Sequence, residues 1–122
     1  MKIIVTVLLI MTGIMAKTGK FETDSFKTRA GGELKITFIK HGSLMFEFDG
    51  KIMYVDPVSD YADYTKLPKA DVVLITHEHG DHLDPKAIAA VEKEGMILIA
   101  NAASQKKLGK GIIMKNGDHL QP

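Results

Sequence analysis

The hydrophobic pattern of the chain changes at about residue 33. Before it, residues 3–15 form a nearly unbroken apolar run, and residues 17–32 are polar without periodicity. After it come short segments rich in β-branched and aromatic residues, whose apolar positions partly alternate as in half-buried strands. We therefore expect strands over residues 34–39, 44–48 and 52–55, joined by tight turns at His41-Gly42-Ser43 and Asp49-Gly50.

The second half of the chain alternates between strand and helix patterns. Residues 71–76 form a continuous apolar run, which is typical of a strand covered on both faces. Asp84 before Pro85 is an N-cap followed by proline at the first helical position, and Gly95 predicts the end of that helix after residue 94. A strand over 96–100, a short helix over 102–108 and a strand over 111–115 follow. The predicted class is therefore α/β (α+β) with a mixed sheet.

The N-terminal pattern predicts a targeting segment. Lys2 precedes the apolar run, and Ala16 ends it before the sequence turns polar. The run is short for a bilayer span but suits the core of a signal peptide, although a buried strand or a retained anchor would also fit. We expect a signal peptide over residues 1–16, a linker over 17–33 that ends in Gly31-Gly32, and one domain over 34–122. The protein would then be exported, to the periplasm or the extracellular space.

Composition excludes several classes of site. The 122-residue chain has a net charge of +1 with mixed signs, so we expect no nucleic-acid partner. It contains no cysteine, which excludes disulfides and thiolate-bound metals. Any metal must therefore be held by histidine, aspartate or glutamate.

The candidate chemistry is concentrated directly after the apolar run 71–76. His77 and His79 are two residues apart, so both rings project to the same side of an extended segment, where they can bind one cation. Gly80 allows a sharp turn, after which Asp81 and His82 can bind a neighbouring cation. Two close cations generate a hydroxide nucleophile at neutral pH and stabilise the leaving oxygen.

Two other interpretations of this cluster compete with a site for two cations. A zincin helix, H-E-x-x-H, does not fit, because the residue four after His77 is Asp81. Alternatively, the groups could simply solvate a loop and cap the helix at Asp84. That alternative places several ionisable groups beside a buried strand without a cation to pair them, which is costly.

These residues resemble the metallo-β-lactamase superfamily, whose signature H-x-H-x-D-H is matched by His77, His79, Asp81 and His82. Residues 36–57, ITFIKHGSLMFEFDGKIMYVDP, resemble the opening strands of its L-ascorbate-6-phosphate lactonase-like branch. The resemblance implies a metal-dependent hydrolase that uses metal-bound hydroxide on an ester, lactone or phosphoester of a small-molecule substrate. It implies zinc, two ions in the complete site, with manganese or iron as alternatives. It also implies a catalytic role for Asp81, and a carboxylate at Asp56 that orients the site without binding metal.

The resemblance implies the N-terminal half of an αββα sandwich, with helices on one face of the sheet. In the family, the second half supplies further histidines and a bridging aspartate. We expect His41 to be a loop residue and not a ligand, and His119 to lie in a surface turn. Tyr61 and Tyr64 either line a substrate cleft or pack on their own scaffold. The alternative function is therefore a truncated or split half-domain that binds metal weakly and has no independent catalysis. It would associate with itself or with a missing C-terminal half in trans.

Overall fold

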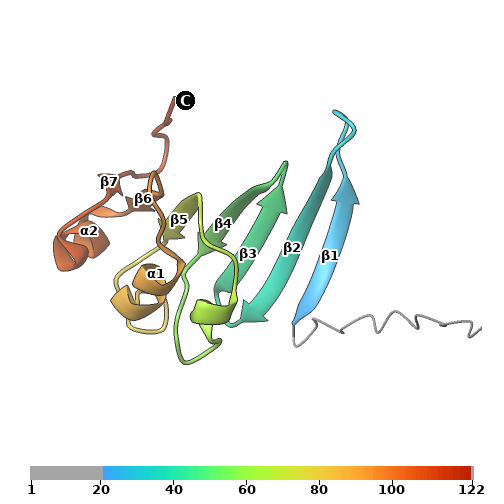
Figure 1. Ribbon diagram of the computed structural model, residues 1–122. Coiled ribbons are helices and arrows are strands. Elements are labelled where there is room, and N and C mark those ends of the chain that lie inside the picture. The colour runs from blue at the N-terminus through green and yellow to red at the C-terminus, as the bar shows by residue number, and fades with distance from the viewer. Residues whose placement is uncertain (1–20, 122) are drawn as a thin grey trace, which may run out of the picture.

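The computed structural model describes residues 21–121, which form a seven-stranded mixed sheet with two α-helices (Figure 1). The strands lie side by side in chain order, β1 to β7. This is the α/β class that the pattern predicts. The elements are β1 (Glu22–Lys27), β2 (Glu33–Lys40), β3 (Ser43–Phe48), β4 (Lys51–Val55), the 3-10 helix η1 (Tyr64–Lys66), β5 (Val72–Ile75), α1 (Pro85–Val91), β6 (Ile97–Ala100), α2 (Ala102–Leu108) and β7 (Ile112–Ile113).

The first four strands form an antiparallel meander. Asp49 and Gly50, with φ of 48° and 70°, make the predicted two-residue turn between β3 and β4. The expected linker over 17–33 is wrong for Glu22–Lys27, which is strand β1. Its residues are all exposed and mostly polar, so no hydrophobic period marks it, and pairing with β2 holds it in place. Gly31, at φ 88°, belongs to the β1–β2 turn.

The last four strands are parallel, and each joins the next through a crossover. Because such crossovers are right-handed and these all step in one direction along the sheet, α1 and α2 cover the same face. Helix α1 begins as predicted, with Asp84 accepting a hydrogen bond from the N–H of Lys86 and proline in the first turn. It ends at Val91, earlier than the predicted residue 94, because Glu92 already adopts an extended conformation.

One face of the sheet carries the hydrophobic core. The register places Tyr54, Val73 and Leu98 in one row across β4, β5 and β6. The apolar side of α1 packs against this row through Ala87, Ile88 and Val91, each at most 1% exposed. The core thus fixes the ends of β4 and β5, from which the candidate site extends.

No described element covers the opposite face, which is apolar across six strands. One row runs through Phe38, Leu44, Val55, Leu74, Ile99 and Ile112. A second row runs through Ile36, Phe46, Met53, Val72 and Ile97. The apolar run of β5 predicts a strand that is covered on both faces. Within residues 21–121, only one face of β5 is covered. We call this surface, defined by the two rows, the open face.

The predicted signal peptide lies outside the described residues. Within residues 21–121, no helix has both the length and the apolar character needed to cross a membrane.

Candidate metal centre

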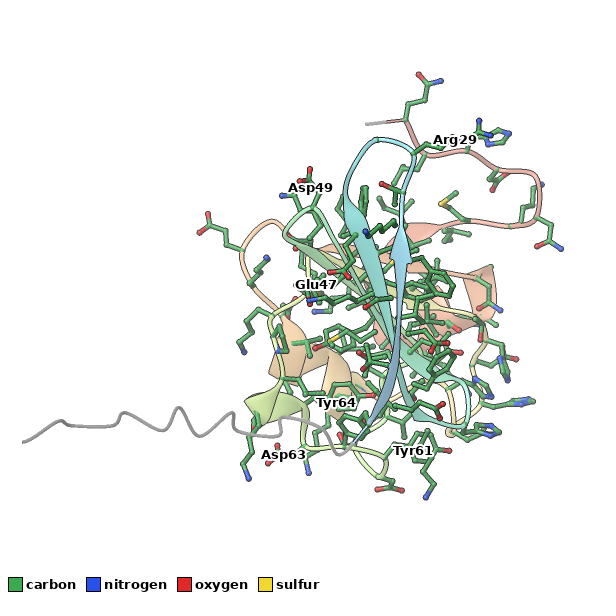
Figure 2. The ribbon with its side chains drawn as sticks, turned by 90° about the vertical axis from the view of Figure 1, so that its right-hand side faces the viewer. Arg29, Glu47, Asp49, Tyr61, Asp63 and Tyr64 are labelled. Atoms are coloured by element: carbon green, nitrogen blue, oxygen red, sulfur yellow. The ribbon has the colours of Figure 1, made fainter. Side chains whose placement is uncertain are left out.

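The candidate ligands gather at the carboxyl ends of three strands. Strand β2 runs antiparallel to β3, and β3 to β4, so β2, β4 and β5 all point the same way. His41 follows β2, Asp56 follows β4 and His77 lies just beyond β5. Figure 2 shows Tyr61, in the loop after β4, at this lower end of the molecule, and Asp49 at the opposite end. The carboxyl ends of parallel strands are where α/β sheets commonly bind ligands.

Asp56 is the buried centre of the site. It is 1% exposed, and its backbone has φ 45°, a left-handed conformation that is unfavourable for a residue other than glycine. Its carboxylate accepts hydrogen bonds from Thr76 N at 2.7 Å, Thr76 Oγ1 at 2.6 Å and His82 Nδ1 at 2.7 Å. These three bonds satisfy the buried charge, and the strained backbone places it between β4 and the loop after β5.

The hydrogen bonds of Asp56 determine where two histidines carry their protons. A carboxylate only accepts, so His82 donates from Nδ1–H, and in the neutral imidazole the lone pair is then on Nε2. Thr76 donates a hydrogen bond to Asp56 through its single hydroxyl proton, so its oxygen, 3.0 Å from His77 Nδ1, accepts a hydrogen bond from the N–H of that nitrogen. In the neutral form of His77 the lone pair is then also on Nε2. A neutral imidazole with a free Nε2 is the form that binds a metal.

The histidine rings are close enough to share a metal centre. The centroids of His77 and His82 lie 4.0 Å apart, and those of His77 and His79 lie 4.7 Å apart. One potential ligand atom from each of His77, His79 and Asp81 falls within 4.8 Å of the others, as does one from each of His41, Asp81 and His82. Nitrogen and carboxylate oxygen donors at this spacing fit zinc, and also manganese or iron.

Asp81 belongs to both groups and is half exposed. Its Oδ2 lies 3.0 Å from His41 Nε2 and 3.6 Å from His82 Nε2. A hydrogen bond from its own backbone N–H, followed by the nearby imidazoles of His82 and His41, lowers the pKa of this carboxyl below its usual range. Asp81 is therefore ionised at neutral pH, as a metal ligand must be.

Several contacts outside the cluster hold its loops. Gly42 is needed for space, because a Cβ at this position would lie 2.7 Å from His82 Cε1. Lys107 of α2 donates to the carbonyl of Glu78 at 2.9 Å, which ties the histidine loop to the helix. Asp84 accepts from Ser59 N at 2.7 Å, which ties the loop after β4 to α1. Burial alone would raise the pKa of Asp84, but the hydrogen bonds from Ser59 and from the start of α1 outweigh it and lower that pKa.

The structure brings Asp56 together with the four motif residues, as the sequence predicts, and it adds Thr76 and His41 to the cluster. Thr76 connects His77 to Asp56, and its position directly before the motif was the one available sequence signal. His41 lies in a loop as expected, but it contacts Asp81, which is 40 positions away, a proximity that sequence spacing does not reveal. The two loop tyrosines differ. Tyr64 is buried in the core against Tyr54, whereas the ring of Tyr61 lies 6.1 Å from that of His41. His119 is exposed, as expected.

Comparison with known proteins identifies similar sequences and a similar crystal structure. A family model described as "Beta-lactamase superfamily domain" matches residues 35–119. A "UPF0173 metal-dependent hydrolase" of Flavobacterium johnsoniae is 41% identical over 76 residues, which cover 57% of this chain and 32% of the relative. A protein of the same description from a Geobacillus species is 32% identical over 69 residues, covering 53% of this chain and 30% of the relative.

The similar structure comes from Parabacteroides distasonis. It is a crystal structure of a protein assigned as a metal-dependent hydrolase, 69% identical to this chain with a TM-score of 0.79. The match covers 80% of this chain and 44% of that protein. The chain thus spans about a third of the length of these curated relatives and less than half of the crystallised one.

Proposed function

Because this chain belongs to the beta-lactamase superfamily, we propose that it carries the metal-binding part of a hydrolase acting on an ester, lactone or phosphoester of a small molecule. The family is one of metal-dependent hydrolases. The observation that supports the proposal most strongly is the hydrogen bonding around Asp56, which holds a proton on Nδ1 of both His77 and His82 and so makes Nε2 the lone-pair nitrogen of each neutral ring. A loop that merely solvated these groups would not need two histidines in the metal-binding form.

Each residue has a separate role in this proposal. His77 and His79 hold one cation, while Asp81 and His82 hold a second. Zinc is the proposed ion, with manganese or iron as alternatives, because the donors are nitrogen and carboxylate oxygen. When bound, such cations lower the pKa of a coordinated water and polarise the carbonyl or phosphoryl group under attack. Asp81, the half-exposed carboxylate beside His41 and His82, would take the catalytic role, and Asp56 orients His82 through its Nδ1.

The experiment is zinc loading of the purified chain followed by assays on lactone and phosphodiester test substrates. The proposal predicts bound zinc that depends on His77 and His79, and hydrolysis that is lost on chelation. The matched control is His119→Ala, which removes an exposed histidine outside the cluster. Stoichiometric zinc without hydrolysis would support metal binding and contradict independent catalysis by this chain.

The open face supports a second candidate function, a half-domain that associates with itself or with a partner chain and has no independent catalysis. Phe38, Ile97 and Ile112 on this face are each at least 39% exposed. A hollow of about 490 Å³, lined in part by Phe46, Phe48 and Met53, lies on the same surface and not at the histidine cluster. Exposed apolar surface of this extent marks an interface more often than a monomer surface.

Sedimentation of the purified chain tests this second candidate. Self-association predicts a species heavier than the monomer, which Phe38→Asp on the open face disrupts. Thr65→Asp, at an exposed position of η1, is the control and should leave the mass unchanged. A monomer in both variants and in the wild type would contradict self-association and leave binding to a separate chain as the version to test.

We also propose that the protein is exported, since residues 1–16 have the pattern of a signal peptide. N-terminal sequencing of the protein recovered outside the cytoplasm should then give a start near Lys17. Recovery of an intact Met1 in the cytoplasmic fraction would contradict it.

A further inference from the structure

The β2–β3 turn holds a histidine that the signature motif does not include. His41 has φ 54°, so a left-handed backbone turns its side chain towards the cluster. Its ring lies 5.0 Å from that of His82 and 6.1 Å from that of Tyr61. The ammonium group of Lys40 lies over the ring of Tyr61, 5.5 Å from its centroid. The ring of His41 is therefore placed between the metal-binding loop and the loop after β4.

We infer that His41 is a ligand of the second cation, forming a three-residue site with Asp81 and His82. This inference rests on the proposed metal binding. Asp56 holds a proton on Nδ1 of His82, so in the neutral ring the lone pair is on Nε2, which lies 3.6 Å from the carboxylate of Asp81. Two acceptors pointing at each other repel unless a proton or a cation lies between them. His41 Nε2 approaches the same carboxylate oxygen at 3.0 Å.

The spacing of these atoms fits one shared cation. Ligand atoms about 2.0–2.1 Å from a tetrahedral zinc lie about 3.3–3.4 Å from each other. The distances of 3.0 Å and 3.6 Å from Asp81 Oδ2 to the two histidine nitrogens lie on either side of this value. A ligand atom from each of the three residues lies within 4.8 Å of the others. His41 thus supplies a third donor for the second cation from within the described chain.

Zinc binding to the chain, measured by competition with a chromophoric chelator, tests the inference. His41→Ala and His41→Gln are compared with the wild type and with His119→Ala as the control. Glutamine can still donate a hydrogen bond to Asp81 but is a poor zinc ligand, so it separates a ligand from a residue that only positions Asp81. Both substitutions are made at a position with a left-handed backbone, φ 54° in the wild type, so any backbone strain affects the two variants alike. Their unfolding free energies are measured to confirm that they fold.

We expect the affinity of the second zinc equivalent to fall about 100-fold or more in both His41 variants, beyond the loss typical of residues outside the ligand set. The His119 variant should bind as the wild type does. Ring ¹⁵N spectra should also show a shift of His41 Nε2 on zinc addition. If His41→Gln alone, or both variants, kept the wild-type affinity for the second zinc ion, the inference would be overturned. The proposed function would not be affected. A wild-type chain that binds no zinc would overturn both.

Discussion

The carboxylate of Asp56 lies 2.7 Å from Nδ1 of His82, and this contact joins the end of β4 to the loop after β5. Through Thr76, the same carboxylate also fixes the proton of His77. One buried carboxylate, outside the motif, therefore holds a proton on Nδ1 of two candidate ligands and orients both rings.

Asp56→Asn should weaken zinc binding about 10–100-fold. The amide would present N–H groups to His82 and Thr76, so Nδ1 of His82 would have to accept a hydrogen bond. The ring proton of His82 would then be on Nε2, the nitrogen proposed to bind the metal. Chelator competition measures the change. Asp60→Asn, at an exposed position of the neighbouring loop, is the control, and an equal effect in both variants would contradict the role given to Asp56.

Thr76→Val should lower zinc affinity about 10-fold or more, whereas Thr76→Ser should preserve it. Valine has nearly the shape of threonine but cannot link His77 to Asp56. It also leaves a partner of the buried carboxylate missing, so the free energy of unfolding should fall by about 1–3 kcal/mol. Urea unfolding together with zinc competition measures both effects. A valine variant that binds zinc as tightly as the serine variant would contradict the link.

Gly42→Ala should displace the ring of His82 and weaken zinc binding. The added Cβ would lie 2.7 Å from Cε1 and 3.0 Å from Nδ1 of His82, so either the ring or the β2–β3 turn must shift. Overpacking of this kind costs about 1–3 kcal/mol of stability. Gly80→Ala is the matched control, because a Cβ there meets no atom within 4 Å. Similar zinc affinities for the two alanine variants would argue against close packing at Gly42.

Much of the fold follows from the sequence, and the exceptions share a cause. Asp49-Gly50 and Asp84-Pro85 carry local turn and capping chemistry, so the β3–β4 turn and the start of α1 could be predicted. Strand β1 could not, because its polar, exposed residues gain order only by pairing with β2. The contact of His41 with Asp81 likewise depends on how β2 and β5 are placed in the sheet. The motif was visible because its residues lie within six positions of the chain, whereas His41 and Asp56, which contact it, follow two other strands, β2 and β4.

Stability should depend on pH through Asp71, which joins β4, β5 and the segment after α1. A hydrogen bond from Lys93, then one from the N–H of Ile52, and the charges of Lys93 and Lys51 lower its pKa. Asp71 therefore stabilises the fold above the unfolded-state pKa of about 3.9, and this contribution is lost as the pH falls through the lower folded-state pKa. Unfolding free energies measured from pH 6 to pH 2 should fall less steeply in Asp71→Asn than in the wild type. Asp24→Asn, on exposed β1, is the control, and identical slopes for Asp71→Asn and wild type would contradict the assignment.

The most direct test of the metal centre is the zinc content of the purified chain after loading and gel filtration, with and without the double substitution His77→Ala/His79→Ala. We predict at least about one zinc ion per chain in the wild type and a clear loss in the double variant, since these histidines would hold the first cation. Circular dichroism of both proteins should confirm that they fold. A folded wild-type chain without zinc, or a double variant with undiminished zinc, would contradict a metal centre at this site.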